Sequence, residues 1–229
     1  MSTNAKPLAM ALEQKNFREI ASAPHAAKSR WDVQGYAGEQ IRGLIQKVFL
    51  SGQPDACRQV VFSAADPIVE TGGLCREVAK TLAELSGKQV CLALASGVIG
   101  NRGSQSIEIP GGLRDSARRL SSGLYLLSRE VFWSGEQGFS ADVPRRRLDQ
   151  LREEFDYSVI QAPAAAADGT AALLGRWSDG LVLVVEANST HRAAARKTLS
   201  ILHAAHIRML GIVLSERTFP IPEKLYRRL

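Results

Sequence analysis

The stretch Val60–Ala95, VVFSAADPIVETGGLCREVAKTLAELSGKQVCLALA, decides the fold of this 229-residue chain. It begins with a short apolar run at Val60–Ala64, which predicts a buried strand, and ends with a second one at Val90–Leu94. Between them, apolar residues recur at helical spacing over Leu74–Leu85, and Gly87 ends that pattern. Strand, loop, helix and strand in this order predict a βαβ unit of the type that opens nucleotide-binding folds.

The loop that precedes the predicted helix lies where such folds bind phosphate, but its chemistry is different. A phosphate-binding loop needs glycines for close backbone approach, a lysine for the phosphate charge and a hydroxyl for magnesium. This loop has two glycines and a hydroxyl but no lysine, and the nearest lysine, Lys80, lies about two turns into the helix. We therefore predict a degenerate nucleotide loop, whose residues are Asp66, Glu70, Thr71, Gly72 and Gly73.

The composition is ordinary for a globular protein, with 45% hydrophobic and 23% charged residues, and the net charge is +6. The arginines fall in scattered clusters at 118–119, 145–147 and 227–228, which we interpret as solvated surface. The alternative is an anionic partner, either nucleic acid or the inner face of a membrane. No aromatic residues interleave the clusters, which argues against nucleic acid.

The cysteines and the hydropathy pattern predict a cytoplasmic protein. Cys57, Cys75 and Cys91 are odd in number and lack metal-ligand or redox spacing, as expected in a reducing compartment. No apolar run reaches membrane-spanning length, and the N-terminus lacks a signal-peptide pattern. No set of histidines, cysteines and carboxylates has the spacing of a metal site, so we expect no metal.

The whole chain reads as a flexible N-terminal arm over residues 1–38 and one domain over residues 39–229. Strands that alternate with helices predict an α/β fold with a doubly wound, mainly parallel sheet flanked by helices. We expect strands at 59–64, 89–95, 124–127, 157–160, 180–186 and 209–214. We expect helices at 39–50, 72–86, 113–120, 144–154 and 164–177, and one that ends at 206 after a cap at Asn188-Ser189-Thr190.

Three stretches of the second half carry a family pattern: Leu151–Pro163 (LREEFDYSVIQAP), Ser178–Val185 (SDGLVLVV) and Leu210–Leu214 (LGIVL). They resemble strands and nucleotide motifs of the bacterial tyrosine kinases of capsule and exopolysaccharide biosynthesis, the CpsD/CapB-like branch of MinD/ParA-type P-loop ATPases. The tail Phe219–Tyr226 resembles tails of the same group. The resemblance covers roughly Glu39 to the C-terminus and implies a P-loop NTPase-like fold.

The same resemblance implies that the nucleotide site is degenerate. The family's lysine aligns near Thr71, and glycines stand where its two hydroxyl residues would be. The family's acidic and adenine-proximal residues at the strand ends are also replaced, at Leu94, Ser96, Gln161 and Ser215. Magnesium binding and phosphoryl transfer need these groups, so we expect no catalytic residue and no cofactor. ATP and magnesium would bind only if the degenerate loop still provides a phosphate site.

These substitutions in an intact set of strands predict a pseudo-ATPase that acts as a cytoplasmic accessory or scaffold in capsule or exopolysaccharide biosynthesis and export. The resemblance implies a membrane polysaccharide co-polymerase or export protein, or an active paralogue, as partner, and that partner could hold the chain at the membrane. One alternative is an active ATPase or protein-tyrosine kinase with a rearranged loop, in which Lys80 or a partner's lysine supplies the charge. Another is a MinD/ParA-like positioning protein that binds DNA or membrane.

Two further family features are partly present. Glu39 and Arg42 match the first half of a Glu-x-x-Arg-x-x-Arg helix that joins kinase subunits into a ring, but Ile45 takes the third position. Homo-oligomerisation through this helix is one hypothesis, and a surface ion pair is the other. The kinases end in a tyrosine cluster, whereas this tail has only Tyr226, which either packs as part of an amphipathic tail or serves as a phosphoacceptor for another kinase.

Overall fold

The computed structural model describes residues 33–52, 56–96, 112–133, 142–167, 169–187 and 189–216. Most of the expected N-terminal arm and the tail with Tyr226 lie outside these residues. Within the described residues, no helix is both long and apolar enough to span a bilayer.

The described strands form one seven-stranded sheet in the order β3-β4-β2-β5-β1-β6-β7. All neighbouring strands are parallel except β3, which runs antiparallel to β4 at one edge. The predicted doubly wound, mainly parallel sheet is therefore confirmed. The strands are β1 Gln59–Ala64, β2 Val90–Leu94, β3 Arg118–Ser121, β4 Leu124–Leu127, β5 Tyr157–Gln161, β6 Gly180–Glu186 and β7 Met209–Ser215.

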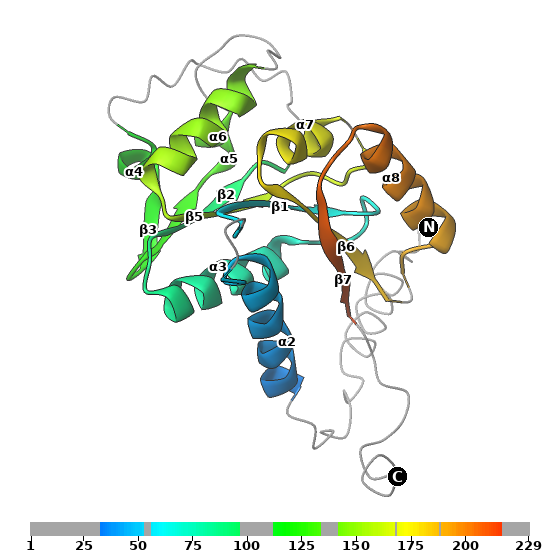
Figure 1. The fold of residues 1–229 in the computed structure, drawn as a ribbon, viewed down its shortest axis with the longest axis horizontal. Coiled ribbons are helices and arrows are strands. Elements are labelled where there is room, and N and C mark those ends of the chain that lie inside the picture. The colour runs from blue at the N-terminus through cyan, green and yellow to red at the C-terminus, as the bar shows by residue number, and fades with distance from the viewer. Residues whose placement is uncertain are drawn as a thin grey trace, which may run out of the picture. The chain divides into compact units, whose positions relative to one another are not determined.

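Helices cover both faces of the sheet (Figure 1). Two of them, α2 and α3, pack on one face, and α4 to α8 pack on the other. The helices are α2 Val33–Val48, α3 Gly72–Ser86, α4 Leu113–Ser116, α5 Arg129–Phe132, α6 Asp142–Glu154, α7 Thr170–Trp177 and α8 Arg192–Ala204. Helix α2 begins six residues before the expected start at Glu39.

Strand β1 explains why the opening stretch decides the fold. Its six residues are all buried, because it lies between β5 and β6 near the middle of the sheet. Val61 packs into the core on the side of α6, α7 and α8, whereas Val60 and Phe62 pack into the core under α2 and α3. Successive side chains thus enter opposite cores, which is why the strand reads as a continuous apolar run.

The expectation of a helix over 113–120 was wrong in its second half. Helix α4 ends at Ser116, and β3 follows at once as an edge strand paired with β4. The residues of β3 are all exposed, so the strand has no apolar alternation that the sequence could reveal. Arginines on an edge strand also discourage pairing with another chain.

Two helices begin later than expected. Helix α7 begins at Thr170 rather than Ala164, because the backbone N–H groups of Ala162 and Ala165 donate to carbonyls of β1 and so extend the sheet. The expected cap of α8 was also wrong. Thr190 accepts a hydrogen bond from the backbone N–H of Glu186 through its hydroxyl, and His191 is the residue before the helix.

Candidate functional site

The candidate site is the loop Ala65–Thr71, which joins β1 to α3 at the carboxyl ends of the parallel strands. From β1 the chain crosses through α3 to β2 on one side, and from β5 it crosses through α7 to β6 on the other side. The strand order therefore reverses at β1. Open α/β sheets bind ligands at such a switch point.

The loop is closed by its own residues. The carboxylate of Asp66 accepts a hydrogen bond from the backbone N–H of Ile68 at 3.1 Å, and the carbonyl of Asp66 accepts one from the N–H of Val69 at 3.1 Å. Val69 is buried in the core under α3, whereas Ile68 is 80% exposed at the tip of the loop. The loop thus forms a tight turn that is anchored by an apolar side chain.

The backbone of this loop differs from that of a phosphate cradle. Such a cradle alternates right- and left-handed residues so that successive N–H groups point at one anion. Residues 65–71 contain no glycine, and none of them has a positive φ. Gly72 and Gly73 also have ordinary φ values, because they form the first turn of α3. The N–H groups of the loop are therefore not arranged to converge on phosphate.

Two polar side chains lie at the beginning of α3. A Cβ atom on Gly72 would lie 3.4 Å from Nε2 of Gln161 and 3.7 Å from a carboxylate oxygen of Glu70. The carboxylate of Glu70 thus stands close to the positive end of the helix dipole, which favours a negative group there. A phosphate at the same place would meet like charge, so Glu70 opposes anion binding. Thr71, the residue before the helix, is buried and makes no side-chain cap hydrogen bond.

The strand-end residues named from the resemblance do not all lie together. The N–H of Ala95 donates to the carbonyl of Gln161 at 2.8 Å, so the end of β2, with Leu94 and Ser96, lies beside the end of β5, and Gln161 of β5 lies beside Gly72. Ser215 lies apart from them at the end of β7, separated from β1 by β6, and its hydroxyl donates to the carbonyl of Val185.

The groups gathered at this site do not fit magnesium and ATP. Magnesium is held by carboxylates and phosphate oxygens, but β2 and β5 end in Leu94 and Gln161, which supply no carboxylate. The loop itself has two carboxylates, of which that of Asp66 already accepts the N–H of Ile68 and that of Glu70 lies beside the first turn of α3. Lys80 is exposed on α3 about 12 Å along the helix axis from Gly72, which is too far to replace the missing lysine of the loop.

Two buried hydroxyl groups that the sequence analysis missed hold the start of the loop. The hydroxyl of Thr198 on α8 donates to the carbonyl of Ala65 at 2.9 Å, and that of Ser63 donates to the carbonyl of Pro163 at 2.7 Å. Both side chains are fully buried. A serine inside the apolar run of β1 and a threonine on the apolar face of α8 were the signals available in the sequence.

The cysteines near the site are structural. Cys75 is buried in the first turn of α3, and burial raises the pKa of its thiol to about 12. Burial also raises the pKa of the Cys91 thiol. Among the described residues, no group of three or more histidines, cysteines or carboxylates could hold a metal ion.

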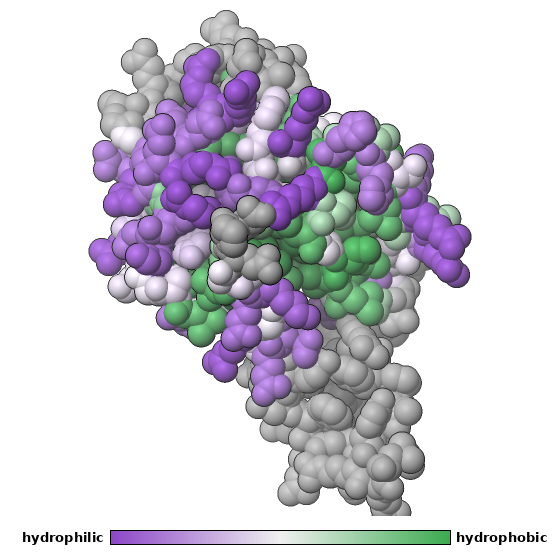
Figure 2. Space-filling model, viewed as in Figure 1, coloured by the Kyte–Doolittle hydropathy of each residue, from purple (hydrophilic) through white to green (hydrophobic). Residues whose placement is uncertain are grey.

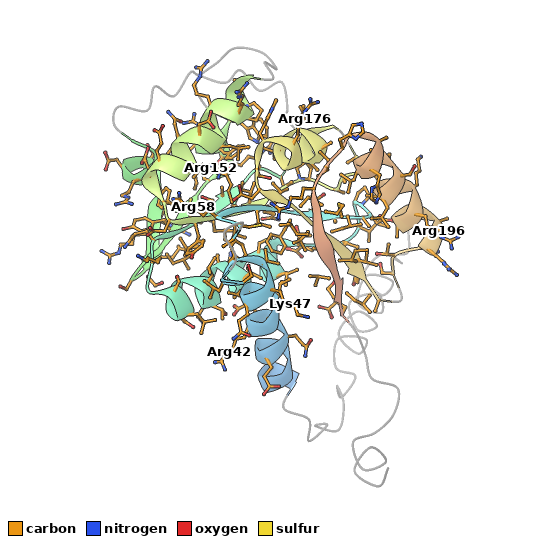
Figure 3. All side chains as sticks on the ribbon, in the orientation of Figure 1. Arg42, Lys47, Arg58, Arg152, Arg176 and Arg196 are labelled. Atoms are coloured by element: carbon orange, nitrogen blue, oxygen red, sulfur yellow. The ribbon has the colours of Figure 1, made fainter. Side chains whose placement is uncertain are left out.

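Helix α2 presents both candidate self-association residues. Glu39 and Arg42 are exposed on α2, and Figure 3 shows Arg42 pointing away from the sheet. Ile45, which takes the third position of the family pattern, is fully buried against the sheet. An arginine at that position could not reach the surface without displacing core residues.

Neither a protein-family model nor a curated protein matches the sequence. Solved structures do match its fold. The kinase domain of Escherichia coli tyrosine kinase ETK is 16% identical with a TM-score of 0.62, over 81% of this chain and 79% of that one. The BceF tyrosine kinase domain is 18% identical with a TM-score of 0.60, over 90% of this chain and 88% of that one. MinD of Aquifex aeolicus is 16% identical with a TM-score of 0.55, over 75% and 72%.

Proposed function

From the fold shared with bacterial tyrosine kinase domains, we propose that this chain is a catalytically inactive relative of them that works through protein contacts. It would serve as an accessory or scaffold protein in capsule or exopolysaccharide biosynthesis and export. The resemblance of its strands to the kinase family supports the pathway, and the geometry of the loop supports the lack of catalysis.

One observation carries the proposal. Gln161 and Glu70 both lie within 4 Å of the same point above Gly72, at the position where a nucleotide-binding fold holds phosphate. The loop before them has no left-handed residue and no lysine. These features act together against a bound phosphate, since charge, backbone geometry and space all oppose it. A protein that keeps the sheet but does not bind phosphate can still use the surfaces of its fold to bind partners.

The partner in this proposal is a membrane polysaccharide co-polymerase or an active kinase paralogue. Co-purification with each candidate, using the full chain as bait, tests the partner. The exposed pair Glu39 and Arg42 on α2 is the first surface to change, because kinase relatives use the matching helix for subunit contacts. A double substitution, E39A/R42A, should lower recovery of a partner that docks on α2. A charge-matched control, R76A/E77A on the exposed side of α3, should leave the recovery of that partner unchanged.

Hydrolysis and autophosphorylation assays test the lack of catalysis. The full chain with ATP and magnesium should release no phosphate above a buffer control, and it should not label its own tyrosines. The ETK kinase domain is the positive control. The substitutions T71A and K80A should leave the background level of phosphate release unchanged. Turnover that either substitution abolishes would replace the proposal by an ATPase or kinase with a rearranged loop.

A further inference from the structure

A second surface, separate from the loop, is formed by α8 and the strand that follows it. Residues 191–215 contain no Asp or Glu, but they contain four cations, Arg192, Arg196, Lys197 and Arg208. All four are exposed, and Figure 3 shows Arg196 pointing away from the sheet. This segment therefore carries exposed positive charge without any acidic residue, whereas α2, α3 and α6 carry charges of both signs.

Stability of the fold does not account for these cations. Among the described residues, none of the four forms an ion pair with a carboxylate. Arg192 also occupies the first turn of α8, and that turn contains no acidic residue. A cation there opposes the helix dipole. Arg192 therefore does not stabilise its helix, and an external anionic partner would give these exposed cations a role.

Three of the four basic side chains, those of Arg192, Arg196 and Lys197, lie on the outer side of α8. Thr198 and Leu202, which are buried, define the inner face. Arg192 and Arg196 lie four residues apart and form one outer row, whereas Lys197 and Ile201 form a second. Ile201 is 38% exposed, so a large aliphatic side chain stands among the cations.

Further aliphatic side chains are exposed on the same face of the sheet. Ile212 and Leu214 of the edge strand β7 are 56% and 52% exposed. Val213 between them packs into the core under α2 and α3, so its two neighbours point to the face that α8 covers. Figure 2 shows hydrophobic surface over β7 and hydrophilic residues over α8. Cations and aliphatic groups are thus exposed together on one face.

We propose that this face, formed by the outer side of α8 and the exposed residues of β7, docks on an anionic phospholipid bilayer. Exposed arginine and lysine bind lipid phosphates, and aliphatic side chains enter the boundary between headgroups and acyl chains. A nucleic acid is a poorer fit, because it offers no apolar layer for Ile201, Ile212 and Leu214. Residues 191–215 also provide no Phe, Tyr or Trp on which bases could stack.

Vesicle co-sedimentation of the full chain tests this inference. Binding to vesicles of 70% phosphatidylcholine and 30% phosphatidylglycerol should exceed binding to pure phosphatidylcholine, and added salt should weaken it. The triple variant R192Q/R196Q/K197Q should bind the anionic vesicles roughly 100-fold more weakly, because the loss of each charge weakens binding by about tenfold or less. The matched control R76Q/K80Q/K88Q loses the same charge from exposed positions in or just after α3 and should bind like the unaltered chain.

Two more variants separate lipid insertion from charge. The double variant I201S/L214S keeps the net charge and should bind the vesicles several-fold more weakly. The conservative variant R192K/R196K should keep most of the binding. Thermal unfolding of each variant checks that the fold is intact.

Three results would overturn the inference. The full chain could fail to bind the anionic vesicles at low salt, or the control triple could lose as much binding as the α8 triple. The third is binding to duplex DNA that the α8 triple abolishes, with no binding to vesicles. Because none of these measurements involves nucleotide, they stand or fall separately from the proposed lack of catalysis.

Discussion

The side-chain amide of Gln161 lies against Gly72, with its Nε2 atom 3.4 Å from the place that a Cβ on Gly72 would occupy. The two residues are 89 positions apart in sequence, and parallel strands β1 and β5 bring them together. By the resemblance to the kinase family, we expect a carboxylate at the position of Gln161 and a hydroxyl at the position of Gly72. An amide and a glycine backbone thus lie together at the carboxyl ends of β1 and β5.

Adding the missing lysine alone should not create a nucleotide site. The variant T71K supplies positive charge next to Gly72, but Glu70 still places a carboxylate there and the loop backbone keeps its negative φ values. Isothermal titration of T71K with ATP and magnesium should therefore give no binding heat. Saturable micromolar binding by T71K would show that charge alone was lacking.

Two glycine substitutions should change stability in opposite directions. Gly73 has a helical φ, and a Cβ there would meet no atom within 4 Å, so G73A should raise the free energy of unfolding by about 0.5–1 kcal/mol. Gly123 has a φ of +79°, and a Cβ there would lie 2.8 Å from the carbonyl oxygen of Lys88. Urea unfolding should show G123A to be clearly less stable than the unaltered chain. Equal effects of the two changes would contradict the described turn.

Asp179 should be the most sensitive carboxylate at the amino ends of the central strands. It accepts hydrogen bonds from the backbone N–H groups of Arg58 and Gln59 at 2.7 and 2.8 Å, and from Arg152 at 2.9 Å. Figure 3 shows Arg58 and Arg152 side by side. Because D179A leaves the two N–H groups unpaired, it should cost about 2–3 kcal/mol in chemical unfolding.

The matched variant R152A tests the source of that cost. It removes one contact of Asp179 but leaves both backbone hydrogen bonds, so it should cost about 1 kcal/mol or less. A loss in R152A as large as in D179A would assign the stability to the ion pair instead of the backbone bonds.

The buried thiols should make the protein less stable in alkaline solution. The pKa of Cys75 is raised to about 12 in the folded chain, whereas an unfolded thiol has a pKa of about 8.5. Above pH 8.5 the unfolded state loses this proton and the folded state keeps it, so unfolding becomes easier as pH rises. Between pH 8.5 and 10 the free energy of unfolding should fall by about 2 kcal/mol less in C75A than in the unaltered chain.

Thiol labelling gives an independent check on the same burial. All three cysteines are buried. A thiol reagent at pH 8 should therefore modify them only after denaturant is added. Rapid labelling of Cys75 in the native protein would contradict its place in the core and would suggest a reactive thiolate at α3.

The central strands and α3 could be predicted because burial leaves a pattern in their sequences. Strands β1, β5 and β6 are buried on both faces and read as apolar runs, and α3 combines helical periodicity with Gly87, whose φ of +64° ends the helix. The edge of the sheet could not be predicted in the same way. Strand β3 is wholly exposed, so its pairing with β4 leaves no pattern in its sequence.

The site was predictable in its position but not in its conformation. The family resemblance named Gln161 as a site residue, and the parallel pairing of β1 and β5 places it beside the first turn of α3. The turn that Asp66 closes is local, but the anchor that Val69 provides depends on contacts with the core under α3, which single residues do not reveal. The basic face of α8 was overlooked because its cations are spaced along the helix instead of clustered in sequence.

Titration of the unaltered full chain with ATP and with ADP, each with and without magnesium, tests the central claim most directly. The described loop predicts no binding heat and no shift in the unfolding temperature with any of the four additions. Saturable micromolar binding, accompanied by a raised unfolding temperature, would show that the loop beside Gln161 and Gly72 still holds phosphate. That result would contradict the proposed loss of the nucleotide site.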